Sequence, residues 1–172
     1  MPVEEIIQCS RLIADKNLKI AFAESASAGW MASEFPLTPY SGDILLGGII
    51  CYDASTKEDL FEIPKRIIDK YTPESAEVTR LLAEGLNKFF KSDIAVAITG
   101  LTAAGGSETT LKPVGTIFIH IVMPGGKYCA HREVFDGTAK EIIGQAMLRT
   151  GQLLTGLVDK YDVPQIDYAK KL

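Results

Sequence analysis

Two short segments rich in glycine, alanine, serine and threonine each follow directly after an apolar run, and their residue types suit the binding of an anion. A turn of this composition after a strand leaves backbone N–H groups and hydroxyls available to phosphate or carboxylate oxygens. A single such turn is more often only a tight connection, whereas two in one chain indicate a nucleotide-like ligand. The expected ligand-binding residues are Glu24, Ser25, Ser27 and Gly29 in the first segment, and Thr99, Gly100, Gly105 and Gly106 in the second.

The second segment comes close to the phosphate-binding P-loop of nucleoside triphosphatases. Gly100 and Gly105 have the required spacing, but Gly106 stands at the position of the P-loop lysine. Without that cation the charge of the terminal phosphates is not compensated, so the pattern does not support a nucleoside triphosphatase. Lys112, stiffened by the following Pro113, could supply a positive charge to a ligand, although an exposed lysine is more often simply solvated.

A tyrosine and a lysine, Tyr52 and Lys57, lie at the end of another apolar run and at the start of the helix expected after it. A buried lysine with a lowered pKa can act as a general base for a serine nucleophile. Ser41, which precedes the run, is the candidate nucleophile, although the residues around it are also typical of an ordinary turn. We expect Ser41, Tyr52 and Lys57 to be catalytic, with N–H groups of the glycine-rich segments stabilising an oxyanion.

Hydrophobic periodicity predicts the elements that must position these residues. Gly47-Gly48 interrupts one apolar run, which suggests a bulge or the close approach of backbone or ligand, so Gly47 joins the expected ligand-binding residues. Helices precede and separate the early strands and a hairpin comes late, so we expect a three-layer α/β/α domain with a mixed sheet. Strands are predicted at 18–23, 44–52, 93–99, 114–122 and 128–135, and the main helices at 3–16, 57–61, from Pro64, 74–91 and 138–160.

Composition limits the function classes. The 172 residues are 47% hydrophobic and 23% charged, which predicts a single globular domain over 1–172 with a tail at 164–172. A net charge of −4 without a basic cluster argues against nucleic acid as a partner. Three cysteines without a C-x-x-C spacing indicate neither a disulfide framework nor a metal site. No apolar run is long enough to span a membrane, and a cytoplasmic location fits best.

An ordered series of motifs covers nearly the whole chain and resembles the CinA carboxy-terminal domain family, whose members include nicotinamide-nucleotide amidohydrolases. The resemblance implies hydrolysis of the carboxamide of nicotinamide mononucleotide to the acid and ammonia, through a serine aided by a tyrosine and a lysine and without a cofactor. The motifs are Ala23-Glu24-Ser25 with Gly29, Gly47-Gly48, Tyr52-x4-Lys57, Ser75 with Ala83-Glu84-Gly85, Thr99-Gly100, Gly105-Gly106, Lys112-Pro113-Val114-Gly115-Thr116 and Phe135-x-Gly137.

The chain also departs from the family pattern at functional positions. The family has Gly-Ser-Ser before its tyrosine, and the second serine is replaced here by Gly42, so that only Ser41 remains. The other departures are Ala26 and Ala28 in the first segment, Ala103 and Ala104 in the second, and Ala139 where the family usually has arginine.

Two hypotheses of different classes follow. In the first, the chain is an amidohydrolase that uses Ser41, Lys57 and Tyr52 on a small pyridine nucleotide. In the second, it is a catalytically degenerate member that binds a nucleotide-like ligand or only assembles with partners. Leu153, Leu154 and Leu157 of the last predicted helix could serve either a homo-oligomer interface or the core.

Overall fold

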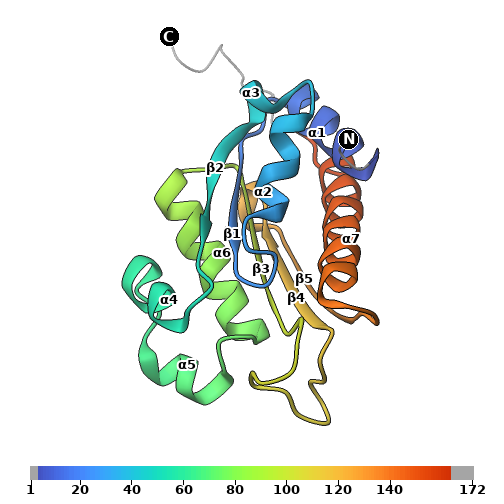
Figure 1. Ribbon diagram of the computed structural model, residues 1–172. Helices are drawn as coiled ribbons and strands as arrows, with labels where there is room; N and C mark the ends of the chain where they lie inside the picture. Colours follow the sequence, from blue (N-terminus) through green and yellow to red (C-terminus); the bar gives the residue numbers. More distant parts are fainter. Residues whose placement is uncertain (1–3, 164–172) are drawn as a thin grey trace.

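The computed structural model describes residues 4–163, so the expected tail at 164–172 lies outside the described residues. A single five-stranded sheet runs through the molecule in the order β2-β1-β3-β4-β5 (Figure 1). Its strands are β1 (Ile20–Glu24), β2 (Leu45–Ile50), β3 (Ile94–Gly100), β4 (Thr116–Val122) and β5 (Tyr128–Val134). The helices are α1 (Glu4–Asp15), α2 (Trp30–Glu34), α3 (Ser41–Ile44), α4 (Ala54–Phe61), α5 (Lys65–Tyr71), α6 (Ala76–Phe90) and α7 (Ala139–Asp159), with short 3-10 turns at Phe35–Leu37 and Pro124–Gly126.

The sheet is mixed. β1 pairs in parallel with both β2 and β3, whereas β3, β4 and β5 are antiparallel neighbours. Because parallel strands end at the same edge of a sheet, the segments that follow β1, β2 and β3 meet at one carboxyl edge. Both glycine-rich segments and the start of α4 belong to this edge.

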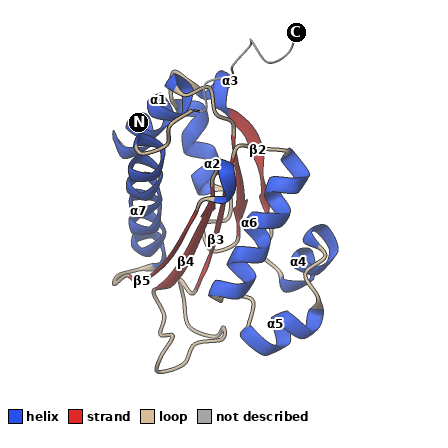
Figure 2. Cartoon of the chain, turned by 180° about the vertical axis from the view of Figure 1, so that it is seen from behind, coloured by secondary structure: helices blue, strands red, loops and turns tan. Residues whose placement is uncertain are grey.

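Helices cover both faces of the sheet, which confirms the expected three-layer α/β/α architecture (Figure 2). One buried core lies between the sheet and the side that carries α1, α2 and α7. A second core lies between the sheet and α6, with α4 and α5 beside it. The side chains of β1 and β3 are buried on both faces, as the continuous apolar runs of their sequences predicted.

The predicted elements are confirmed with small shifts at their ends. Leu154 of α7 is fully buried in the first core, and Leu153 and Leu157 pack against it. These leucines therefore contribute to the core of the chain itself. None of the helices within residues 4–163 is both long enough and apolar enough to cross a membrane.

Candidate active site

Glu24, the last residue of β1, organises the first glycine-rich segment. Its carboxylate is 1% exposed. It accepts hydrogen bonds from Ser27 Oγ at 2.6 Å and from the backbone N–H groups of Gly29, Met31 and Ala32 at 3.1, 3.0 and 2.6 Å. A carboxylate is the natural partner of N–H groups at the start of a helix. Glu24 and its donors therefore hold the segment together. Glu24, Ser27 and Gly29, which were predicted as ligand contacts, are hydrogen-bonded to one another and do not line the pocket described below.

Ser25 follows at the carboxyl edge with its backbone fixed and its side chain directed at a lysine. Its N–H donates to the carbonyl of Ile98 at 2.9 Å, which continues the pairing of β1 with β3. Its Oγ lies 3.2 Å from Nζ of Lys57. The residue predicted as a ligand contact is thus a serine within hydrogen-bond reach of the predicted base.

Lys57 reaches Ser25 from α4. The side chain of Asp53 caps this helix by accepting from the Ser55 N–H at 2.8 Å, and Lys57 lies one turn further on. Its side chain is 0% exposed. Nζ also donates to the carbonyls of Cys51 and Tyr52 at 2.7 and 3.2 Å. Burial lowers the pKa of Lys57 below its ordinary value, and this outweighs the opposing influence of nearby acidic groups.

The three partners of Lys57 suit proton transfer. A neutral amine has two N–H donors and one lone pair. The two carbonyls of Cys51 and Tyr52 take the two donors, which leaves the lone pair for the hydroxyl proton of Ser25. The ammonium form donates to the same three oxygens. Lys57 can therefore take the Ser25 proton and return it without moving, which is the requirement for a preorganised general base.

Ser25 opens onto a pocket of about 260 Å³ at the carboxyl edge. Among residues 4–163, no acceptor pairs with the N–H of Ala26, the residue directly after the serine. This is the position that supplies an oxyanion donor in many acyl-transfer enzymes. The lining residues are Ser25, Ala26, Tyr52, Glu74, Gly100, Leu101, Thr102, Ala103, Ala104, Gly105 and Gly106.

Tyr52 contributes differently from expected. Its side chain is 69% exposed and lines the pocket. Its backbone carbonyl, rather than its phenol, contacts Lys57, and within the described part of the chain the phenol has no hydrogen bond to Ser25 or Lys57. The side chain of Tyr52 thus lines the pocket, and its backbone carbonyl helps to hold the Lys57 amine in place.

Ser41 lies at the opposite edge of the sheet from Lys57, so its predicted role as nucleophile is wrong. It begins α3, which precedes β2, whereas Lys57 lies in α4, which follows β2 (Figure 1). The six residues of β2 separate the two ends by about 20 Å at about 3.3 Å per residue. No adjustment of the turn at Gly42 bridges that distance.

Lys112 fastens the second glycine-rich segment rather than facing a ligand. Its Nζ donates to Thr72 Oγ1, Ser107 Oγ and the Glu74 carbonyl at 2.5, 2.7 and 3.0 Å. Ser107 Oγ in turn donates to Glu74 Oε2 at 2.5 Å. These bonds tie the segment to the start of α6 and leave Lys112 with three partners inside the protein.

Two other predicted ligand contacts lie away from the pocket lining. Thr99 is fully buried, and its hydroxyl meets that of Thr79 at 2.8 Å, which ties β3 to α6. Gly47 lies within β2 at φ +139°, where a Cβ atom would stand 3.3 Å from the ring of Phe90. Gly47 therefore permits the close packing of α6, and the interruption in the sequence reflects a neighbouring side chain rather than a ligand.

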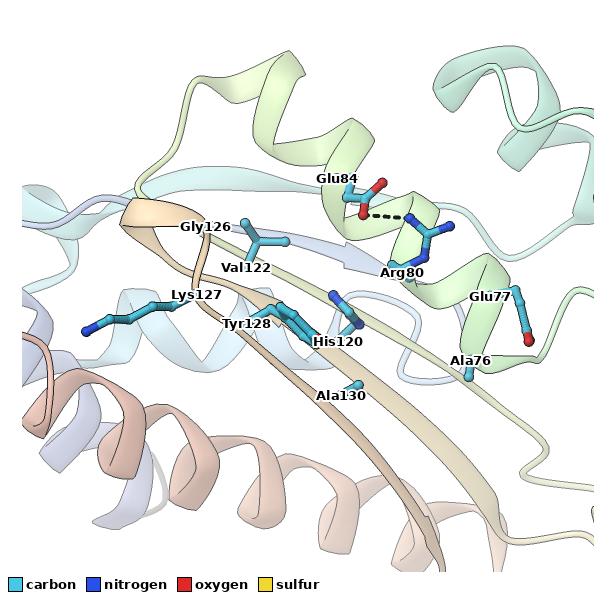
Figure 3. A pocket seen from close by; sticks show the side chains of 10 residues that line it. All are labelled: Ala76, Glu77, Arg80, Glu84, His120, Val122, Gly126, Lys127, Tyr128 and Ala130. Carbon is cyan, nitrogen blue, oxygen red and sulfur yellow. Dashed lines mark hydrogen bonds and ion pairs between the residues drawn. The ribbon is translucent and has the colours of Figure 1, made fainter.

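A larger hollow of about 560 Å³ lies between α6 and the hairpin of β4 and β5 (Figure 3). His120 is 5% exposed at its floor, and its ring stacks on that of Tyr128 with centroids 5.5 Å apart. Arg80 pairs with Glu84 at 2.7 Å on the facing helix. Its described lining contains no serine, threonine or cysteine, whereas the smaller pocket contains Ser25 beside Lys57.

The fold and site define an α/β protein with a buried serine–lysine pair at the carboxyl edge of a mixed sheet. Residues 4–158 match the family described as CinA C-terminal domain, and the chain belongs to this family. It is 34% identical to the CinA-like proteins of Synechococcus sp. (strain RCC307) and Geotalea uraniireducens (strain Rf4), over 70% and 76% of this chain. The chain spans only 28% and 31% of the lengths of these relatives.

The fold agrees with solved structures of the same superfamily. The crystal structure of a competence-damaged protein (CinA) superfamily protein from Klebsiella pneumoniae superposes with a TM-score of 0.86 at 18% identity, over 92% of this chain and 98% of that one. At this identity the similarity extends to the fold alone.

Proposed function

We propose that this chain is a serine amidohydrolase that hydrolyses the carboxamide of a nicotinamide compound to the carboxylic acid and ammonia, with Ser25 as nucleophile. The observation that carries the proposal is the contact of 3.2 Å between Ser25 Oγ and Nζ of the fully buried Lys57. The family resemblance supplies the pyridine carboxamide as substrate class and nicotinamide mononucleotide as the reference compound.

The reaction uses the pair twice. Lys57 accepts the Ser25 proton while Oγ attacks the amide carbon, and the N–H of Ala26 stabilises the developing oxyanion. Lys57 then donates the proton to the amide nitrogen, the C–N bond breaks and ammonia leaves an ester on Ser25. Water attacks this ester with Lys57 again as base, and the proton returns to Ser25 Oγ as the acid departs.

Ammonia release by the purified chain tests the proposal. Nicotinamide mononucleotide and nicotinamide riboside are supplied separately to the wild type, Ser25→Ala and Ser41→Ala proteins. We expect Ser25→Ala to abolish release and Ser41→Ala to retain it, because Ser41 lies at the other edge of the sheet. Equal rates for the wild type and Ser25→Ala would refute the proposal.

A catalytically degenerate chain that only binds its ligand would behave differently. It would release no ammonia from either compound, while calorimetry would still detect binding to the wild type. That combination would replace the hydrolase with a binding module at the same pocket.

A further inference from the structure

The hollow between α6 and the hairpin of β4 and β5 takes no part in the proposed reaction (Figure 3). It is open because small residues face it, namely Ala76 on α6, Ala130 on β5 and Gly126 at the turn. A Cβ atom at Gly126 would meet no heavy atom within 4 Å beyond its own chain neighbours. The volume of about 560 Å³ lies within the range of about 300 to 1,000 Å³ that is usual for small-molecule sites. The hollow is therefore large enough for a ligand of its own.

His120 lies at the floor of this hollow with its imidazole unpaired. The residue is 5% exposed, and within residues 4–163 no hydrogen bond joins its ring nitrogens to another group. A smaller hollow of about 180 Å³ shares His120, Ala76 and Ala130 with the larger one, so the residue borders both. A nearly buried polar side chain in a folded protein normally has a hydrogen-bond partner. His120 therefore indicates a partner that enters the hollow.

The protonation state of His120 limits what that partner can be. Burial lowers the pKa of His120 below its ordinary value of 6.5, the carboxylate of Glu84 opposes this shift, and the guanidinium of Arg80 adds to it. The imidazole is thus neutral at neutral pH, with one N–H donor and one nitrogen acceptor. Such a ring suits an uncharged partner that itself offers both a donor and an acceptor.

Tyr128 supplies an aromatic surface beside His120. The two rings are stacked with 9° between their planes and 5.5 Å between their centroids, yet Tyr128 is 66% exposed. Flat rings pack well in such offset stacks, and the open tyrosine ring leaves room for one more. Stacking on an aromatic side chain is a common way in which proteins hold a nucleobase. The hollow therefore favours a planar ligand.

The facing side of the hollow, on α6, offers donors and acceptors for the edge of such a ring. Arg80 Nη1 donates to Glu84 Oε1 at 2.7 Å, and the other polar atoms of these two side chains have no partner among the described residues. Glu77 also lines the hollow and has no side-chain hydrogen bond in the same part of the chain. The two carboxylates are balanced by Arg80 and Lys127, so the formal charges of the lining cancel. An uncharged ring with an amino donor and a ring-nitrogen acceptor matches this surface.

We infer that the hollow between α6 and the β4–β5 hairpin is a second ligand site, which binds an uncharged, amino-substituted nitrogen heterocycle of the nucleobase type. His120 and the polar side chains of α6 hold the edge of the ring, and Tyr128 holds its face. The site is separate from the pocket at Ser25, because the two have no lining residue in common. The inference does not depend on the proposed function.

A pair of nucleosides tests the recognition of the ring edge. Adenosine is the probe, and purine riboside differs from it only in lacking the amino group. Calorimetry on the purified chain at neutral pH should show adenosine binding at least about fivefold more tightly than purine riboside, the effect of one lost hydrogen bond. An absence of adenosine binding, or equal affinities for the two nucleosides, would overturn the inference.

Two tyrosines of similar exposure locate the bound adenosine. Tyr128 is 66% exposed in the hollow, and Tyr52 is 69% exposed in the pocket at Ser25. We expect Tyr128→Ala to weaken adenosine binding by at least about fivefold, because a stacked base is lost. Tyr128→Phe should retain the affinity, and Tyr52→Ala should leave it unchanged. An unchanged affinity in Tyr128→Ala, or an equal loss in Tyr52→Ala, would overturn the assignment to the hollow.

His120→Phe removes the ring nitrogens and keeps a flat ring beside Tyr128. We expect adenosine to bind this variant at least about fivefold more weakly than the wild type, while a cooperative urea transition shows that the variant is folded. Wild-type affinity in the folded variant would contradict the role given to His120. None of these measurements uses ammonia release, so a failure of the proposed amidohydrolase would leave them intact.

Discussion

Two serine–lysine pairs lie near the same pocket, and their difference shows why a short contact alone does not define a catalytic pair. Lys57 Nζ is 3.2 Å from Ser25 Oγ, and Lys112 Nζ is only 2.7 Å from Ser107 Oγ. The other hydrogen-bond partners of each serine and lysine show which pair can transfer a proton. Ser107 donates its proton to the Glu74 carboxylate at 2.5 Å, so that proton is already held by an anion rather than offered to the lysine.

The surroundings of the two lysines also favour Lys57 as the base. Lys57 is completely buried and has two neutral carbonyls as its other partners, which favours the neutral amine that a base requires. Burial lowers the pKa of Lys112 as well, against the nearby carboxylates of Glu74 and Glu108, but Lys112 is only partly buried. The pair at Ser25 is therefore the one suited to proton transfer, and the pair at Ser107 fastens a loop.

The largest contrast is expected between the two serines. Ser25→Ala should lower kcat by about 10⁴-fold or more, since it removes the nucleophile. Ser107→Ala should leave kcat within a few-fold of wild type, because it removes only a bond within the loop. Ammonia release measures both, and a larger loss in Ser107→Ala would reverse the assignment of the two pairs.

Substitution of Lys57 should affect activity, whereas substitution of Lys112 should affect stability. Lys57→Met should reduce kcat by about 10²- to 10⁴-fold, the usual contribution of a general base. Lys112→Met should instead reduce the free energy of unfolding by about 1 kcal/mol, because partly exposed oxygens lose one donor. Ammonia release and urea unfolding distinguish these effects, and a similar loss of kcat in both variants would remove the contrast.

The pH profile should identify the lysine that titrates during catalysis. Lys57 acts as a base only when it is neutral, so kcat/KM should rise with pH as its proton is lost. Because burial lowers the pKa of Lys57, the rise should be centred below the ordinary lysine value of 10.5. Lys112→Met should keep this profile, whereas the residual activity of Lys57→Met should lack it. A rise that persists without Lys57 would assign the titration to another group.

The smallest effect concerns the backbone of the two segments. Ala28 has φ +49° in the first segment, whereas the second uses Gly105 at φ +99°. A left-handed conformation is strained for alanine, so Ala28→Gly should raise the free energy of unfolding by up to about 1 kcal/mol. Gly105→Ala should lower it by about 1 to 2 kcal/mol. Denaturant unfolding measures both, and a change of the same sign in both variants would contradict this difference.

The sequence was sufficient to predict the strands and the main helices, and the buried lysine that it predicted as a base is found at the carboxyl edge as Lys57. It also contained the signal that Ser25 lies beside Lys57, because Ser25 follows a strand that neighbours the strand before Lys57, whereas Ser41 precedes that strand. The pairing of these two strands was the missing information. The hydrogen bonds that the Glu24 carboxylate accepts within the first segment depend on side-chain direction, which residue types and spacing do not specify.

The most direct measurement identifies the serine that carries the acyl group. The chain is mixed with nicotinamide mononucleotide, quenched with acid during turnover and digested, and the modified peptide is mapped by mass spectrometry. We expect a pyridine-carbonyl ester on Ser25 that is absent from the Ser25→Ala protein. An ester on Ser41 or Ser107 would contradict it.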